Sequence, residues 1–388
     1  MARTNNSIKT RARLRIAAIS VLVFGSSLLV QSNATNYVLL PSIKTDVSQE
    51  SLMLDATTSG ERTLIVGEQG HILYSDDNGS SWTHADVPVS LAITAVTFAG
   101  PGKAWATAHD GVLLQSTDNG ASWQVKLTGI DVARLSVGAA EERVKLLEAA
   151  LEQATPETLE DLEWALDDAT FAVDDAMAAI EEGVTTPLLN VWFANENDGY
   201  AMGAYGVFLH TSDGGTTWGL DSNRLDNPDK YHLYGMTRSS AGTLFLAGEA
   251  GTVLRSRDGG ETFEPVTTSY TGSFFGAVAA NDGSLLVYGL RGNVFRSTDD
   301  GDSWSAIDTG DQRTLLGGTK RANGTIVLVG SAGAVLISAD HGRSFKTIPT
   351  TGNKVYSGVT EIADGGLLLV GFGGISFVDS TAASGASS

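Results

Sequence analysis

Residues 211–218 read Thr-Ser-Asp-Gly-Gly-Thr-Thr-Trp, and this eight-residue pattern occurs six times along the chain. Every copy fits the form Ser/Thr-x-Asp-x-Gly-x-Ser/Thr-Trp/Phe, and the other five copies begin at residues 75, 116, 256, 297 and 338. Neighbouring copies start 41 or 45 residues apart, except for a gap of 95 residues between the second and the third. A period in the low forties that holds several short strands is typical of a β-propeller blade.

The chemistry of the octet favours a tight hairpin turn. Its Asp can accept hydrogen bonds from backbone N–H groups two residues on, and its Gly tolerates a positive φ. The closing Trp or Phe has a large ring to bury beside the neighbouring blade. We therefore interpret the six octet aspartates as structural and assign no catalytic residue among them: Asp77, Asp118, Asp213, Asp258, Asp299 and Asp340.

The blade count follows from a second repeated turn, Gly-x-x-Gly, which stands between the second and third strands of each unit. Residues 365–378 repeat these strands and this turn a seventh time, without an octet and without a fourth strand. Residues 37–41, Tyr-Val-Leu-Leu-Pro, are expected to supply the missing strand and so close the ring. The sequence thus predicts an all-β, seven-bladed propeller over residues 35–379.

The long gap contains an insertion at residues 138–183, between blades two and three. Leucines at helical spacing, and a second helix start at Thr155-Pro156-Glu157, predict an αα-hairpin. This segment carries 14 acidic and two basic residues. Two interpretations stay open: a solvated acidic surface element, or a lid or docking arm for a protein partner.

The first 34 residues have the features of a secretory signal peptide. Five basic residues precede an apolar run at 16–30, and Ala34 offers a cleavage site. Export to the periplasm, or secretion, is therefore expected, and the polar tail at 380–388 is expected to be disordered. Removal of the segment changes the net charge from −20 to −25, which makes nucleic acid and anionic lipid poor partners. The chain has no Cys, so it can form no disulfide.

The octets match Asp-box (BNR) repeats, and residues 198–218 resemble a blade of the photosystem II stability/assembly factor family. The resemblance covers residues 37–378 apart from the helical insertion. It implies an exported, non-enzymatic propeller that docks on a membrane protein or protein complex at the outer side of the inner membrane. It implies no cofactor, and we expect a monomer. The family's docking surface is associated with arginines, whereas Arg is sparse on the corresponding turns here.

The alternative is a glycan-binding or glycan-cleaving propeller, because sialidases also contain Asp boxes. Hydrolysis needs two carboxylates about 5–10 Å apart in a cleft, and Glu68, Asp110, Glu249 and Glu361 are candidates. Solvated turn acids explain them more simply. The six His residues show no metal-binding spacing, so we predict no metal site and no catalytic residue.

A binding surface is expected on the face that carries the Gly-x-x-Gly turns, because side chains vary there from blade to blade on a fixed frame. Tyr234 and Phe275, 41 residues apart, are either equivalent core residues, which we favour, or part of that surface. The candidate face consists of Glu68, Gln69, His109, Asp110, Tyr205, Glu249, Arg291 and Phe372. The sequence thus favours a protein-binding assembly factor.

Overall fold

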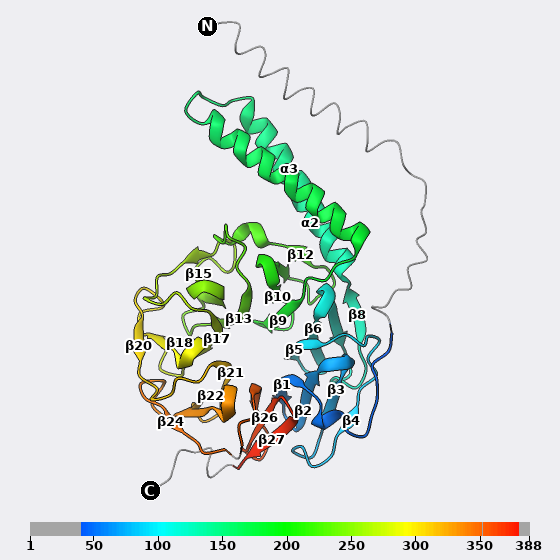
Figure 1. The fold of residues 1–388 in the computed structure, drawn as a ribbon, viewed down its shortest axis with the longest axis vertical. Helices are drawn as coiled ribbons and strands as arrows, with labels where there is room; N and C mark the ends of the chain where they lie inside the picture. The colour runs from blue at the N-terminus through cyan, green and yellow to red at the C-terminus, as the bar shows by residue number, and fades with distance from the viewer. Residues whose placement is uncertain (1–39, 351, 380–388) are drawn as a thin grey trace, which may run out of the picture. The chain divides into compact units, whose positions relative to one another are not determined.

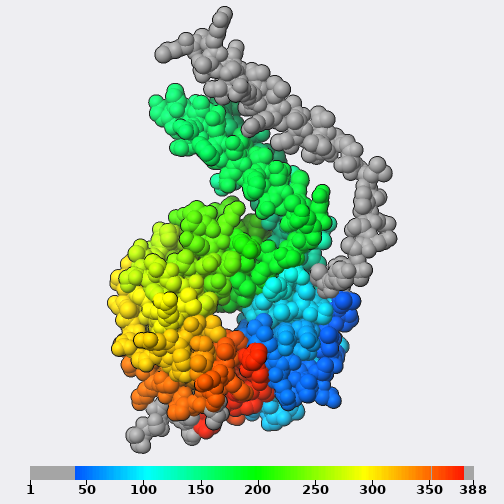
Figure 2. Space-filling view, viewed as in Figure 1, coloured from blue at the N-terminus to red at the C-terminus, as the bar shows by residue number. Residues whose placement is uncertain are grey.

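The computed structural model describes residues 40–350 and 352–379. Seven antiparallel sheets follow one another around a central opening, as the ribbon and the space-filling view show (Figure 1, Figure 2). Within the described residues, six of these sheets have four strands and the last has three. The seven-bladed propeller predicted from the repeat is therefore confirmed. The expected signal peptide at 1–34 and the tail at 380–388 lie outside the described residues.

The first three blades take the chain from residue 53 to residue 220. Blade one consists of β1 (Met53–Ser59), β2 (Arg62–Gly67), β3 (Ile72–Ser75) and β4 (Thr83–His84). Blade two consists of β5 (Ile93–Gly100), β6 (Lys103–Ala108), β7 (Leu113–Ser116) and β8 (Gln124–Leu127). Blade three consists of β9 (Leu188–Phe193), β10 (Gly199–Gly203), β11 (Phe208–Thr211) and β12 (Gly219–Leu220).

The remaining blades repeat this order without an insertion. Blade four consists of β13 (Leu233–Arg238), β14 (Leu244–Gly248), β15 (Val253–Ser256) and β16 (Glu264–Pro265). Blade five consists of β17 (Phe274–Ala279), β18 (Leu285–Gly289), β19 (Val294–Ser297) and β20 (Ser305–Ile307). Blade six consists of β21 (Leu315–Lys320), β22 (Ile326–Gly330), β23 (Val335–Ser338) and β24 (Lys346–Thr347). Blade seven consists of β25 (Tyr356–Glu361), β26 (Leu367–Gly371) and β27 (Gly374–Val378).

The ring closes where β25 of blade seven packs beside β1 of blade one. The Ser357 hydroxyl donates to the Met53 carbonyl at 2.9 Å, and the hydroxyls of Thr360 and Thr58 lie 3.1 Å apart. Side-chain hydrogen bonds between the innermost strands therefore join the first blade to the last.

The closing strand expected at 37–41 falls mostly on residues that the structure does not describe. Of its described members, Leu40 and Pro41 are in no strand. The following residues lie against blade one, where the Ser42 N–H donates to the Val87 carbonyl at 3.0 Å and the Ile43 N–H donates to the Gln69 carbonyl at 3.3 Å. A short 3-10 turn at Ser48–Glu50 then contacts β27 before the chain enters β1.

The core is divided among the interfaces between neighbouring blades, as expected for a propeller. Trp105 of blade two is fully buried, with its ring centroid 5.5 Å from that of Phe193 and 5.3 Å from that of Trp218, both in blade three. Trp218 closes its octet, and Phe263 closes the octet of blade four and packs at 5.3 Å on Phe208 of blade three. The octet aromatics therefore pack against the preceding blade.

The octet at 211–218 shows how the Asp box is held together. The Thr211 hydroxyl, 1% exposed, donates to Asp213 Oδ1 at 2.9 Å and accepts from the Gly215 N–H at 2.9 Å. Asp213 accepts from the Thr217 N–H at 2.9 Å and from the Thr217 hydroxyl at 2.7 Å. The bonded N–H thus lies four residues after the Asp, not two as expected. These bonds lower the pKa of Asp213 to about 2.

The insertion is the expected αα-hairpin, formed by α2 (Gly129–Leu151) and α3 (Leu159–Glu182), which lie side by side (Figure 1). Helix α2 begins before residue 138 because Thr128 and Asp131 form a capping box, in which the Thr128 N–H donates to Asp131 Oδ2 at 3.0 Å. Val132 and Ala133 are buried, Val132 among core residues of blades two and three. No helix in the described part of the chain is long and apolar enough to span a membrane.

Candidate functional site: the Gly-x-x-Gly face

The Gly-x-x-Gly turns share one backbone geometry, which presents a side chain at the tip of each turn. The third residue of the turn has a positive φ between 50° and 58° in blades one to six, although none of these residues is Gly. These residues are Gln69, Asp110, Tyr205, Ala250, Arg291 and Ala332. Most of these tips are exposed, and their side chains differ from blade to blade, so the face has a fixed frame and a variable surface.

The glycines of this turn allow two chain segments to approach it closely. In blade four, a Cβ at Gly248 would collide with the carbonyl of His232, which precedes the innermost strand. A Cβ at Gly251 would collide with the carbonyl of Tyr270, in the connection to blade five. The turns and the connections between blades therefore lie together on one face.

Each innermost strand carries a one-residue β-bulge at the end that faces these turns. In β13, for example, Leu233 pairs with Gly248 and Gly235 pairs with Ala247, so that Tyr234 is left unpaired. The unpaired residues are half-buried in all seven blades: Leu54, Thr94, Leu189, Tyr234, Phe275, Leu316 and Ser357. A bulge re-aims its side chain, and several of these side chains reach the neighbouring blade, as the hydroxyls of Ser357 and Thr94 do by donating to the carbonyls of Met53 and Leu188.

Four of the rings on this face form a continuous row across blades three, four and five. Tyr205 packs edge to face on His232 with a centroid distance of 5.0 Å, and His232 lies 6.2 Å from Tyr234. Tyr234 in turn packs on Phe275 at 5.1 Å. Tyr205 is 63% exposed, and the other three rings are half-buried. We call these four residues the aromatic row.

Glu249 fixes the middle of the aromatic row. Its Oε2 accepts from the His232 N–H at 3.3 Å and lies 3.7 Å from His232 Nδ1. Burial, with Glu249 nearby, raises the pKa of the Tyr234 hydroxyl, which keeps that group neutral. Tyr234 and Phe275 occupy equivalent bulge positions, and both are half-buried, between the two expectations of core and surface.

A cleft of about 300 Å³ lies on the outer part of blade four, and Tyr231, which precedes His232 of the aromatic row in sequence, is one of the residues that line it. Asn227, Pro228 and Tyr231 form one side of it, and Thr252 and Pro265 lie on the other. The Asn227 side chain donates to the Tyr231 carbonyl at 3.0 Å and accepts from the Tyr231 N–H at 3.0 Å, so its loop is held in place. We call this hollow the blade-four cleft.

The structure brings together some of the eight candidate face residues and separates others. Tyr205 and Glu249 both contact His232, and the exposed Arg291 is at the turn tip of blade five. Gln69 and His109 are exposed on the turns of blades one and two, and Phe372, 71% exposed, is on blade seven. His232 was not among the expected site residues, and of the residues that line the blade-four cleft only Tyr231 could be expected, as an aromatic residue in a connection between blades. The pairing of His232 with Tyr205 depends on contact between two blades, for which the sequence has no local signal.

The candidate carboxylates for hydrolysis are engaged in local structure. Glu68 Oε1 accepts from the Leu52 N–H at 3.0 Å, and Asp110 Oδ1 lies 3.6 Å from His109 Nδ1 in the same turn. Glu361 accepts from Arg321 Nε at 2.9 Å and from the Ala322 N–H at 2.7 Å. Among the residues described, no three His, Asp or Glu side chains are grouped so as to hold a metal ion.

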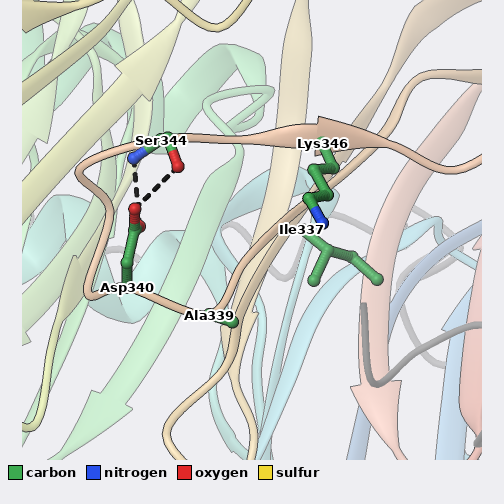
Figure 3. A pocket seen from close by; sticks show the side chains of 5 residues that line it. All are labelled: Ile337, Ala339, Asp340, Ser344 and Lys346. Atoms are coloured by element: carbon green, nitrogen blue, oxygen red, sulfur yellow. Dashed lines mark hydrogen bonds between the residues drawn. The ribbon is translucent and has the colours of Figure 1, made fainter. Parts of the chain in front are cut away.

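A second hollow, of about 210 Å³, lies beside the Asp box of blade six (Figure 3). Ile337, Ala339 and Lys346 line it together with Asp340 and Ser344. The Asp340 carboxylate accepts from the Ser344 N–H at 3.0 Å and from the Ser344 hydroxyl at 2.6 Å (Figure 3). The acid that lines this hollow, Asp340, is hydrogen-bonded within its own turn. The aromatic row and the blade-four cleft are therefore the better candidate site.

The fold and its turns define a seven-bladed propeller of Asp-box repeats. Residues 171–347, from α3 to the end of blade six, match the family described as "Photosynthesis system II assembly factor YCF48". This match confirms the resemblance to the photosystem II assembly factor-like family. No curated protein sequence matches this chain.

Solved structures share the fold at low sequence identity. A structure of YCF48 bound to D1 peptide has a TM-score of 0.58 and 14% identity, covering 89% of this chain and 98% of that chain. YCF48 from Cyanidioschyzon merolae has a TM-score of 0.57 and 14% identity, covering 85% and 96%. A streptogramin B lyase has a TM-score of 0.60 and 14% identity, covering 85% and 94%. At such identities the likeness extends to the fold alone.

Proposed function

We propose that this chain is an exported, non-enzymatic propeller that binds an extramembrane segment of a membrane protein and so helps to assemble or stabilise a membrane complex. The observation that carries the proposal is the aromatic row, which lies partly exposed beside the blade-four cleft. Exposed aromatic rings that are already held in place are a common feature of protein-binding surfaces, because they contribute large contact area at little entropic cost.

The family resemblance supports a protein as the ligand. The YCF48 in one similar structure is bound to a D1 peptide, which is a protein segment. The blade-four cleft and the aromatic row adjoin at Tyr231 and His232, and a peptide segment that occupies both would contact blades three to five. Several polar groups in this region are already hydrogen-bonded to the protein, as Asn227 and Glu249 show. A ligand would therefore meet a surface whose shape is set in advance.

The test is a library of overlapping peptides that covers the extramembrane segments of the host's membrane proteins. Binding of each labelled peptide to the purified chain is measured by fluorescence anisotropy, and a glycan array is run in parallel with the same preparation. Selective binding of a few peptides supports the proposal. Binding to glycans, with no selective peptide, would replace it with the carbohydrate-binding alternative.

A further inference from the structure

The outward side of helix α3 carries two aromatic rings that the hairpin does not bury. Trp164 is 72% exposed and Phe171 is 70% exposed. They are seven residues apart, which is close to two helical turns, so they lie on the same side of the helix. The side that packs toward α2 holds other residues, among them the buried Ala169 and the half-buried Leu162 and Leu166. The two rings therefore do not contribute to the packing of α3 against α2.

Carboxylates flank the two rings along the same helix. Glu160 and Asp168 lie four residues before and after Trp164, and Asp175 lies four residues after Phe171, so each adjoins an aromatic ring. Asp161 lies on the same side, and all four of these acids are exposed. Among the described residues, none of the four forms a salt bridge, whereas Lys145 pairs with Glu142 on α2. We call the six residues 160, 161, 164, 168, 171 and 175 the α3 face.

We propose that the α3 face is a docking surface for a basic, amphipathic segment of a protein. The segment's Lys and Arg would pair with the four carboxylates, and its apolar side would cover Trp164 and Phe171. A cation over the face of a Trp ring is also favourable in itself. The four acids favour a basic partner, because opposite charges attract. Single exposed apolar residues are common on proteins, but solubility does not explain a pair of exposed aromatic rings among unpaired acids.

Charge also argues against three other occupants. Anionic lipid and nucleic acid are repelled by the acids of this face. A second copy of the chain would bring the same acidic face, on a protein whose net charge is −20. This proposal concerns the hairpin and is independent of the ligand of the Gly-x-x-Gly face.

The probe is an 18-residue amphipathic peptide of Leu and Lys, with a Leu and Glu peptide of the same pattern as its comparator. Affinity for the full chain is measured by fluorescence anisotropy at low and at moderate salt. The first variant is Trp164→Ala/Phe171→Ala, and the second converts the four acids of the face to their amides. The matched control is Phe377→Ala, which removes a ring that is 50% exposed from β27 of the propeller, outside both proposed binding surfaces.

Both α3 variants are expected to weaken binding of the Lys peptide at least tenfold, while the control variant binds as the unaltered chain does. The amide variant should also lose most of the salt dependence. Circular dichroism checks that each variant remains folded, which is expected because every altered residue of the α3 face is exposed. Equal binding by all variants, equal binding of the Glu peptide, or no binding of the Lys peptide would overturn the proposal. So would dimers that the Trp164→Ala/Phe171→Ala variant abolishes, or binding of the chain to phosphatidylglycerol vesicles through this face.

Discussion

Tyr205 of blade three and His232 of the connection to blade four meet edge to face, with their ring centroids 5.0 Å apart. Neither residue belongs to the hydrophobic core, and Tyr205 is 63% exposed. The contact extends through Tyr234 to Phe275 and so links three blades on one face. Because the Tyr205 ring is mostly exposed, we expect its loss to affect binding more than folding.

Replacement of Tyr205 by Ala is expected to weaken peptide binding by at least tenfold, because loss of an aromatic anchor typically costs about 1–2 kcal/mol or more at a binding hot spot. The melting temperature should change little, since the side chain is mostly exposed. Anisotropy and differential scanning calorimetry measure the two quantities. Phe372→Ala, which removes an exposed ring from blade seven, is the matched control and should bind normally. A large fall in melting temperature for Tyr205→Ala would assign the ring to stability instead.

Replacement of Thr211 by Val removes the hydroxyl that bonds to both Asp213 and Gly215 in the Asp box, while it keeps the shape of the side chain. The variant leaves the buried Gly215 N–H without the hydroxyl that accepts from it at 2.9 Å. An unsatisfied buried donor costs about 1–3 kcal/mol, so the free energy of unfolding should fall by that amount in a urea titration. Thr211→Ser should restore most of it, and Ser80→Ala, at an exposed position of another octet, should be neutral. A Val variant as stable as the unaltered chain would contradict this account of the octet.

Asp55 predicts a pH dependence of stability below neutrality. Burial raises its pKa to about 6, although its carboxylate accepts from the N–H groups of Val96 at 2.9 Å and Ala56 at 2.8 Å. Because the folded pKa lies above the unfolded value of 3.8, the folded state keeps its proton longer. The contribution of Asp55 to the free energy of unfolding is therefore full below pH 4. It falls by about 2–3 kcal/mol as the pH rises through about 6.

The Asp55→Asn variant should remove this decline. Thermal melts between pH 4 and pH 7 are compared for the unaltered chain, for Asp55→Asn and for Asp86→Asn, whose acid is exposed. Only Asp55→Asn is expected to flatten the profile. The same slope in all three proteins would show that Asp55 is not the group responsible.

His210 predicts a second loss of stability with rising pH, in a higher pH range than that of Asp55. Its Nδ1 lies 3.2 Å from Asp221 Oδ2 and its Nε2 lies 3.0 Å from Asp198 Oδ1. The hydrogen bond to Asp221, with help from Asp198, raises the pKa of His210 above its usual 6.5. The stability it contributes is full below pH 6.5 and is lost as the pH rises through the folded pKa. An NMR titration of the His210 ring should give a pKa above 6.5 that falls in Asp221→Asn, and a value at or below 6.5 would contradict the geometry.

The repeat could be predicted from the sequence because its parts are local. The hydrogen bonds of the octet join residues of a single turn, namely Thr211 to Asp213 and Gly215 to Thr211. The same spacing therefore recurs wherever this turn recurs. The start of α2 was missed although the signal is present, since Thr128 and Asp131 have the spacing of a capping box.

The aromatic row could not be predicted, because its contacts join different blades. The spacing of 41 residues shows that Tyr234 and Phe275 are equivalent, but it does not show that both are bulge residues that stay half-buried. His232 has no periodic partner with an aromatic side chain that would have singled it out. On α3, the spacing of Trp164 and Phe171 fits a buried side as well as an exposed one, and only the structure distinguishes them.

Site-specific photo-crosslinking in the native host tests the proposed binding face most directly. In one variant of the chain a photoreactive phenylalanine replaces Tyr205. In a second variant it replaces Ser240, which is exposed in the turn between β13 and β14, on the opposite side of blade four. Cross-linked peptides are identified by mass spectrometry. We expect the probe at 205 to capture an extramembrane segment of a membrane protein, and the probe at 240 not to capture it. Equal capture of that segment at both positions, or none at position 205, would contradict the assignment of binding to the Gly-x-x-Gly face.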